Sequence, residues 1–428
     1  MHYNELSKRS LWVLLLRGGG AGLTFFLTLV FARLLGPIEF GLYSLGFAIL
    51  SILSVISRFG LDNVVLKQVA AHYPAQPDIY CSYIQKGIIL TAGIGAIVVV
   101  LMWMFSEIIA SNIFQEPRLS EVLDLFSFVL IPMSLMYILS EIYKGQGKPN
   151  HSVFILVFLP PLITLVFVFF IWSVWEISLS KLIVALGVGF LASLLVCFFK
   201  LRKMMTKIWE TKLSYLELLK QSYPMLLVSS ISLFLGWSDM IILGIFSELG
   251  DIGIYSVATR VALVTTLVLL SVNTVVAPKY ASLYKKKAMF DLKKLSQKTS
   301  KILFGAVLVP TCICLFFPEW VMGWFGDEYA SGAFILIILV IGQFVNVLSG
   351  SVRYLLTMTG GENKLRRILF YTALMNIILS VFFVRLYGSL GVASATSISL
   401  VTWNIWATIE VRKHLGFWPI NLLYSANK

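Results

Sequence analysis

The chain consists of long apolar runs separated by short polar breaks. Crossing the hydrocarbon of a bilayer takes roughly 20 mostly apolar residues in a helix, and most of the 428 residues fall into runs of that length. The pattern predicts about twelve membrane helices, at residues 12–33, 41–59, 86–110, 119–141, 151–172, 178–200, 223–246, 254–277, 301–325, 330–356, 366–386 and 389–413. No ten-residue alternation of apolar and polar positions recurs, so a β-barrel is not expected. The predicted fold class is an all-α polytopic membrane protein.

Basic residues gather in alternate breaks between these runs. One set of breaks and termini holds most of the 34 lysines and arginines, whereas the other set holds only Arg33, Arg118, Lys181 and Arg385. Cytoplasmic loops carry the excess of Lys and Arg in membrane proteins, so both termini are expected in the cytoplasm. These loops account for the net charge of +13, and nucleic acid is therefore not an expected partner.

The most basic break, residues 278–301, contains eight lysines. Tyr284, Ala288, Leu292 and Leu295 recur there at helical spacing beside the lysines. This pattern predicts an amphipathic helix along the inner leaflet. Retention of the loop in the cytoplasm explains the lysines equally well.

Few residues offer catalytic or metal-binding chemistry. The four cysteines, Cys81, Cys197, Cys312 and Cys314, form no paired framework, so neither disulfides nor a metal site is inferred from them. The breaks on the outer side are too short for an extracytoplasmic catalytic domain. We therefore expect a chain that is not an enzyme and has no cofactor.

The chain contains an internal repeat. Three segments of the first half recur in order in the second half: residues 40–44 at 252–256, 62–65 at 273–276, and 145–148 at 360–364. Each half then holds six helices, as residues 1–210 and 211–428. Because six is even, both halves enter the membrane from the same side and are parallel repeats. Two six-helix lobes around a central cavity, with alternating access between them, are the expected architecture.

Polar residues on the first helix of each half predict walls of that cavity. Arg17 shares a helix face with Thr24, and the repeat matches this face to Ser229 and Ser232. An arginine at the bilayer centre costs roughly 2.5–3.5 kcal/mol, so it normally faces protein or water. Close packing through small residues at Gly18 and Gly22 is the alternative explanation.

A second polar stripe lies in the predicted span 330–356. Gln343, Asn346 and Arg353 recur there at helical spacing, and a polar stripe is costly against lipid. We expect it to face the cavity as well, although Arg353 could instead extend to the inner interface.

Two pairs of opposite charges are candidates for gating or ion coupling. Arg58 and Asp62 have the i,i+4 spacing of a local ion pair. Asp239 and Arg260 lie at similar depth in neighbouring predicted helices, so they can form either a structural pair or a switch. Asp239 is the best carboxylate for coupling to protons or sodium.

Several motifs together resemble a known family. They are Arg17–Gly20 followed by residues 31–44, Asp239 followed by residues 242–244 and 253–258, and residues 361–364, Asn376 and 388–396. As an ordered set, they resemble polysaccharide flippases of the O-antigen and lipid-linked oligosaccharide type, in the multidrug/oligosaccharidyl-lipid/polysaccharide exporter superfamily. The resemblance extends through the chain.

The resemblance implies a substrate and a location. The substrate is an oligosaccharide repeat unit on undecaprenyl pyrophosphate, moved to the outer leaflet of a bacterial inner membrane, with membrane lipids, a polysaccharide polymerase and a chain-length regulator as further partners. Arginine suits the pyrophosphate, and Arg17 and Arg353 are placed toward the cytoplasmic side. A cation-coupled multidrug antiporter of the same fold is the alternative. Arginine rather than a carboxylate on the first helix counts against it.

Overall fold

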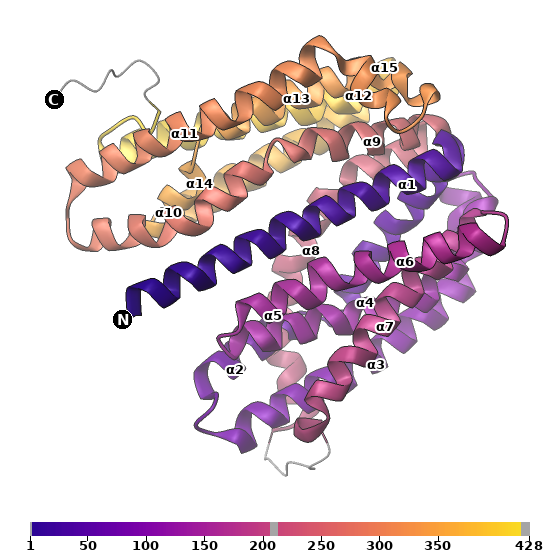
Figure 1. Ribbon diagram of the computed structural model, residues 1–428, viewed down its shortest axis with the longest axis horizontal. Helices are drawn as coiled ribbons and strands as arrows, with labels where there is room; N and C mark the ends of the chain where they lie inside the picture. The colour runs from indigo at the N-terminus through magenta and orange to yellow at the C-terminus, as the bar shows by residue number, and fades with distance from the viewer. Residues whose placement is uncertain (1, 206–212, 421–428) are drawn as a thin grey trace. The chain divides into compact units, whose positions relative to one another are not determined.

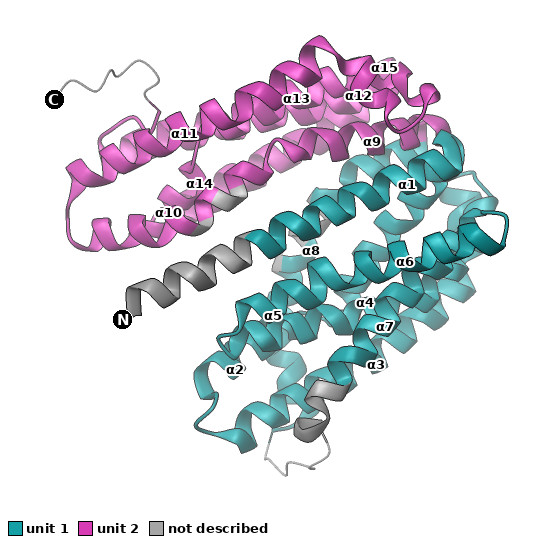
Figure 2. Ribbon diagram, in the orientation of Figure 1, with its two compact units in different colours: residues 1–245 teal, residues 246–428 magenta. Residues whose placement is uncertain are grey.

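The structure, a computed structural model, is helical and confirms the all-α membrane fold. It describes residues 2–205 and 213–420, without the side chains of residues 2–14, 199–205, 228, 231–235, 270, 271 and 274. Within these residues, nine helices are long and apolar enough to cross a membrane. By their contacts the helices form two compact units, residues 1–245 and 246–428 (Figure 2).

Unit 1 contains the first eight α-helices (Figure 1). They and two short π-helical segments are α1 (His2–Arg58), α2 (Leu61–His72), α3 (Pro77–Ile108), η1 (Ile109–Ile113), α4 (Arg118–Gly145), α5 (Pro149–Val153), η2 (Phe154–Phe158), α6 (Leu159–Val174), α7 (Leu179–Met205) and α8 (Tyr215–Phe246). The contacts thus group α8 with unit 1, up to Ile245, whereas the repeat makes it the first helix of the second lobe. The lobe boundary at 210/211 stays a prediction.

Unit 2 contains the remaining helices (Figure 1). They are α9 (Leu249–Val264), α10 (Leu267–Lys285), α11 (Met289–Phe316), α12 (Pro318–Gly323), the 3₁₀ segment η3 (Asp327–Gly332), α13 (Ala333–Leu348), α14 (Val352–Met358) and α15 (Glu362–Leu415).

The two longest helices each contain a break at a glycine. A straight helix of 54 residues, such as α15, would be about 80 Å long, against about 30 Å of hydrocarbon. Gly388 takes φ 57° and ψ −134° inside α15, and Gly36 takes φ 70° and ψ 173° inside α1, just before Pro37. Glycine adopts such angles readily. Each helix therefore consists of two segments, in agreement with two predicted spans each.

The prediction of a surface helix over residues 278–301 is wrong. α10 continues to Lys285, the chain turns at Lys287 with φ 56°, and α11 begins at Met289. Leu292 is fully buried and packs in the unit 2 core with Tyr280 and Val352. Residues 278–301 therefore form a hairpin between two membrane helices, and its apolar residue Leu292 faces the protein core instead of lipid.

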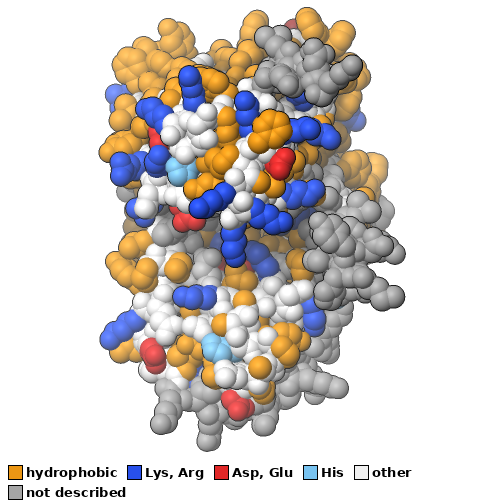
Figure 3. All heavy atoms as spheres, turned by 90° about the vertical axis from the view of Figure 1, so that its left-hand side faces the viewer, with side chains coloured by type: hydrophobic (Ala, Val, Ile, Leu, Met, Phe, Trp, Pro, Cys, Tyr) orange, Lys and Arg blue, Asp and Glu red, His pale blue; other side chains and the backbone are white. Residues whose placement is uncertain are grey.

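The lysines of this hairpin remain on the surface. The side chains of Lys285, Lys286, Lys287, Lys293, Lys294 and Lys298 are all exposed. Figure 3 shows basic side chains gathered on the face where the α10–α11 turn lies. This is the end that the charge pattern predicts to be cytoplasmic.

Two further spans are interrupted. The predicted span 254–277 is divided at Thr265 and Thr266, between α9 and α10, and the predicted span 330–356 is divided at residues 349–351, between α13 and α14. Irregular backbone at membrane depth is tolerated where protein or water surrounds it. The second interruption includes Ser349, whose hydroxyl donates to the Asn346 carbonyl and which forms part of the site described next.

Candidate functional site

The junction of α1 and α2 carries a buried arginine. α1 ends at Arg58, and Phe59 and Gly60 then take φ values of 50° and 74°, which turns the chain before α2 begins at Leu61. Arg58 is only 7% exposed. A charge buried in this way must be paired and hydrogen-bonded.

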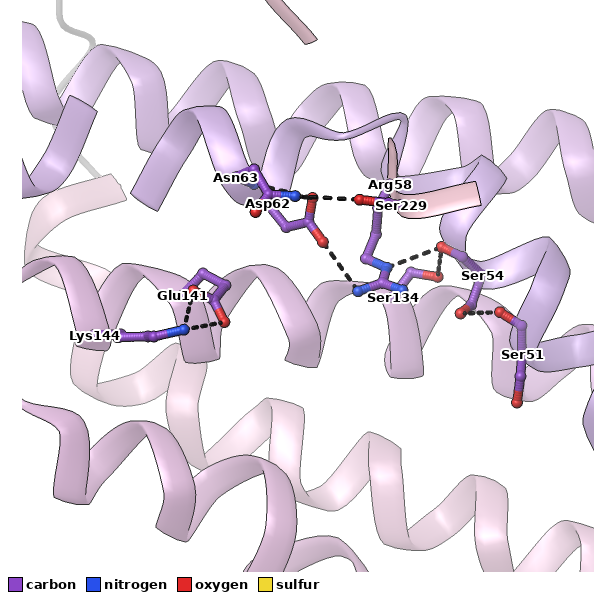
Figure 4. A network of polar contacts seen from close by, with 9 residues as sticks. All are labelled: Ser51, Ser54, Arg58, Asp62, Asn63, Ser134, Glu141, Lys144 and Ser229. Atoms are coloured by element: carbon purple, nitrogen blue, oxygen red, sulfur yellow. Dashed lines mark hydrogen bonds and ion pairs between the residues drawn. The ribbon is translucent and has the colours of Figure 1, made fainter. Parts of the chain in front are cut away.

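Three groups surround the Arg58 guanidinium. Nη1 donates to Asp62 Oδ2 at 3.1 Å, and Nε donates to the Ser54 carbonyl, also at 3.1 Å (Figure 4). The guanidinium also lies 4.1 Å from the ring centroid of Tyr137 on α4, a cation–π contact that gains strength away from water. The expected i,i+4 ion pair is present, and a gating role for it stays a prediction.

The same junction contacts α8 within unit 1. Asn63 Nδ2 donates to Ser229 Oγ at 3.3 Å (Figure 4). A Cβ atom on Gly60 would lie 2.5 Å from the nitrogen of Leu226 and 2.6 Å from the carbonyl oxygen of Ser222. Only glycine permits so close an approach of two backbones. Ser229, predicted to line the cavity, is thus also part of the packing between α2 and α8.

The polar face of α1 is partly a packing surface. Thr24 Oγ1 donates to the Gly20 carbonyl at 2.9 Å, and a Cβ on Gly20 would lie 2.8 Å from the Val157 carbonyl oxygen in η2. At Gly18 and Gly22, by contrast, a Cβ would meet no atom within 4 Å. The close helix packing of α1 is therefore at Gly20, and not at Gly18 and Gly22, the two glycines with small-xxx-small spacing.

Arg17 lies one turn before this contact. Its side chain is exposed and, among the residues that the structure describes, makes no hydrogen bond or ion pair. Thr24 is half-buried and satisfied by its own helix. Both remain candidates for the cavity wall, and Arg17 has its full hydrogen-bonding capacity available for an anion.

In unit 2, α13 and α15 share a network of amide side chains. Asn346 Nδ2 donates to Gln343 Oε1 at 3.1 Å, and Asn404 Nδ2 donates to Asn346 Oδ1 at 3.3 Å. The Ser349 hydroxyl donates to Asn404 Oδ1, and Asn404 is only 1% exposed. The structure therefore brings the predicted pair Gln343 and Asn346 together and adds Asn404 and Ser349 to it.

Arg353 lies beyond the break that ends α13. Gly350 takes φ 73° there, and a Cβ on it would lie 2.4 Å from Ser300 Oγ. The Arg353 side chain is exposed in the first turn of α14. It is not part of the amide network, so the single polar stripe predicted for this span is divided into two.

Three further predictions concern residues of α8 and α9. Asp239 on α8 and Arg260 on α9 are both half-buried, and one belongs to unit 1 and the other to unit 2. Their pairing stays a prediction. The side chain of Ser232 lies outside the described residues.

Metal and thiol chemistry find little support in the described part of the chain. No three His, Cys, Asp or Glu residues there are grouped to hold a metal ion. All four cysteines are free thiols, and three of them are buried.

Two important contacts had only weak sequence signals. Tyr137 lies far from Arg58 in sequence, so no local spacing connects them. Asn404 is the one asparagine in the predicted span 389–413, and an amide within an apolar helix is the signal that could have identified it, because it needs a buried partner.

Sequence comparison finds relatives along the chain. The profile of a family described as "Polysaccharide biosynthesis protein" matches residues 6–284. A "Probable low-salt glycan biosynthesis flippase Agl15" of Haloferax volcanii is 26% identical over 92% of this chain and 81% of its own length. An "Uncharacterized membrane protein MJ1068" of Methanocaldococcus jannaschii is 24% identical over 97% of this chain and 86% of its own.

Solved structures share the fold. The chain is similar to the lipid II flippase MurJ in an inward closed conformation, with a TM-score of 0.71 and 18% identity, covering 92% of this chain and 86% of that one. It is also similar to an inward-facing multidrug resistance MATE family transporter of the MOP superfamily, with a TM-score of 0.72, 15% identity and 94% of both chains covered.

Proposed function

Because this chain belongs to the Polysaccharide biosynthesis protein family of membrane transporters, we propose that it flips a lipid-linked oligosaccharide across the membrane for the assembly of surface glycans. The chain is a multi-pass membrane protein of a transporter family and not an enzyme. The name of the Haloferax relative, a glycan biosynthesis flippase, is the observation that carries the proposal.

The proposed cargo is an oligosaccharide on a polyprenyl carrier, undecaprenyl pyrophosphate, moved from the cytoplasmic to the outer leaflet. A pyrophosphate is held best by cations with several donors. Arg17 and Arg353 are exposed and supply five donors each. Arg58, in contrast, is already occupied by Asp62, Ser54 and Tyr137, so it is a structural and gating candidate and not a carrier ligand.

The proposed architecture is two lobes of six membrane helices each, with alternating access. The breaks at Gly36 and Gly388 divide α1 and α15 into two crossings each, and α8 supplies a further one. Gly147 and Gly360 take φ values of 72° and 84° at the turns that precede α5 and α15, and this similarity supports the proposed repeat.

The proposed orientation follows the charges and places both termini in the cytoplasm. The curated relatives come from Haloferax volcanii and Methanocaldococcus jannaschii, which are archaea, so the bacterial inner membrane is proposed from the sequence resemblance alone. A partnership with a polymerase and a chain-length regulator is proposed on the same resemblance.

A cation-coupled multidrug antiporter is the second candidate. The chain shares its fold with a multidrug transporter, which brings this candidate into consideration. It shares the same fold with MurJ, which brings in a lipid II flippase. Both similarities are below 25% identity and show the fold alone. Between Trp12 and Gly36 of α1, Arg17 and Arg33 are the charged residues and no carboxylate is present, which favours an anionic cargo.

The test is deletion of the gene with two measurements on the same cells. We expect loss of surface glycan, accumulation of the lipid-linked oligosaccharide and unchanged drug tolerance. Intact surface glycan with reduced drug tolerance would replace the flippase proposal by the antiporter.

A further inference from the structure

The amide network of unit 2 has a defined direction. The backbone carbonyl of Leu400 can only accept a hydrogen bond, so the Asn404 side-chain atom that lies 2.8 Å from it is Nδ2. The same Nδ2 lies 3.3 Å from Asn346, and that atom must therefore be Oδ1. Such amide orientations are assigned from the network, and here a backbone group determines the assignment.

The direction extends along the network to Gln343. With its Oδ1 facing Asn404, Asn346 turns its Nδ2 toward Gln343 and donates to Oε1 at 3.1 Å. Gln343 Nε2 is then the outer end of the network. It has no acceptor among the residues that the structure describes, and the side chain is only half-buried. The donor is therefore partly exposed and available to a ligand.

We propose that Gln343 Nε2 is a sugar-binding donor, which donates a hydrogen bond to a hydroxyl or acetamido carbonyl oxygen of the glycan. The proposal rests on the proposed flippase function. It assigns Asn346, Asn404 and Ser349 as positioning residues, because they hold the Gln343 amide in one orientation. Gln343 is the specificity-determining residue.

The chemistry of the network favours sugar over phosphate. Its four side chains are neutral, and Arg353 lies beyond the break at Gly350, in another helix. Neutral amides pair well with hydroxyl and carbonyl oxygens, whereas a phosphate is bound best by charged donors. Consecutive hydrogen bonds also polarise one another, so the outer N–H of Gln343 is a stronger donor than an isolated amide.

The direction makes a specific prediction for a residue remote from the glycan. In Asn404→Leu, which has a side chain of similar size, no donor remains for Asn346 Oδ1. Asn346 can then turn its Oδ1 toward Gln343 Nε2, so that Gln343 presents Oε1 outward. The variant should weaken the sugar donor although Gln343 itself is unchanged.

The experiment measures affinity of the purified full chain in nanodiscs for two lipids. One probe is the glycolipid that accumulates in cells lacking the protein, and the other is undecaprenyl pyrophosphate without sugar. Gln343→Met, which keeps the side-chain length, should weaken glycolipid binding about two- to tenfold, the worth of one hydrogen bond, and leave the sugar-free lipid unchanged. Asn404→Leu should give part of the same loss, and the double variant should lose no more than Gln343→Met alone.

Thr402→Val is the matched control on α15, because the Thr402 hydroxyl donates only within its own helix, to Ile398 at 2.8 Å. It should bind both probes as the unmodified chain does. Unchanged glycolipid affinity in Gln343→Met, an equal loss for both probes, or the same loss in Thr402→Val would overturn the sugar donor. An unmodified chain that binds neither probe would instead contradict the proposed function on which it rests.

Discussion

Arg58 at the end of α1 forms an ion pair with Asp62 in the first turn of α2, with 3.1 Å between Nη1 and Oδ2. Their side chains are only 9% and 13% exposed. Removing one partner of a buried pair leaves an uncompensated charge and costs about 3–5 kcal/mol. Asp62→Leu should therefore lower the melting temperature of the purified protein clearly, and Arg58→Met added to it should restore part of the loss.

Lys144 and Glu141 provide the control for that pair. Their charged atoms are 3.0 Å apart with i,i+3 spacing, but the Lys144 side chain is 50% exposed. Exposed pairs contribute little because water screens them, so Lys144→Gln should barely change the melting temperature. Equal losses in Asp62→Leu and Lys144→Gln would contradict the buried-pair account.

Gly60→Ala tests the contact between the α1–α2 junction and α8. Gly60 and Gly147 have nearly equal φ values, 74° and 72°, so alanine is strained by a similar amount at both, about 1–2 kcal/mol. Only at Gly60 would the added Cβ meet backbone, at 2.5 Å from Leu226. At Gly147 it would meet no atom within 4 Å.

We therefore expect Gly60→Ala to lower the melting temperature more than Gly147→Ala. The difference between the two variants measures the close packing on α8, because the backbone strain is common to both. Equal melting temperatures would contradict the close packing, because they would mean that α8 can move away from Gly60 at no cost in stability.

Much of the fold could be predicted from the sequence because its causes are local. Long apolar runs predict helices because the backbone polar groups must form their hydrogen bonds within the segment when lipid surrounds it. Gly36 with Pro37 marks a break in α1. The prediction for residues 278–301 was wrong because apolar residues at helical spacing fit a lipid-facing helix and a buried hairpin equally well. Leu292 decides between them, since it is buried in the same hydrophobic cluster as Tyr280 and Val352.

The site was less predictable because it depends on contacts between distant segments. The spacing of Arg58 and Asp62 predicts their ion pair, but no spacing predicts Tyr137. Likewise, Gln343 and Asn346 are recognisable on one helix, whereas Asn404 joins them from another. A buried amide reveals that it needs a partner, not which partner it has.

The orientation of the chain can be tested by labelling single cysteines from each side of the membrane. In a chain whose four native cysteines are replaced by alanine, Lys286→Cys at the α10–α11 turn should react with an impermeant thiol reagent only after the membrane is opened. Glu176→Cys, between α6 and α7, should react in intact cells, because both positions are exposed and the basic side is cytoplasmic. The reverse pattern would invert the proposed topology.

Flipping by the reconstituted protein tests the central claim most directly. The chain is placed in liposomes with the glycolipid that accumulates in cells lacking it, and the glycolipid reaching the opposite leaflet is measured. Arg17 and Arg353 are exposed and have no side-chain partner among the described residues, so Arg17→Ala/Arg353→Ala should keep the melting temperature. We predict that the unmodified chain flips the glycolipid and that this double variant does so at least tenfold more slowly. No flipping by the unmodified chain would contradict the proposed function, and an unchanged rate in the double variant would contradict the assignment of these arginines.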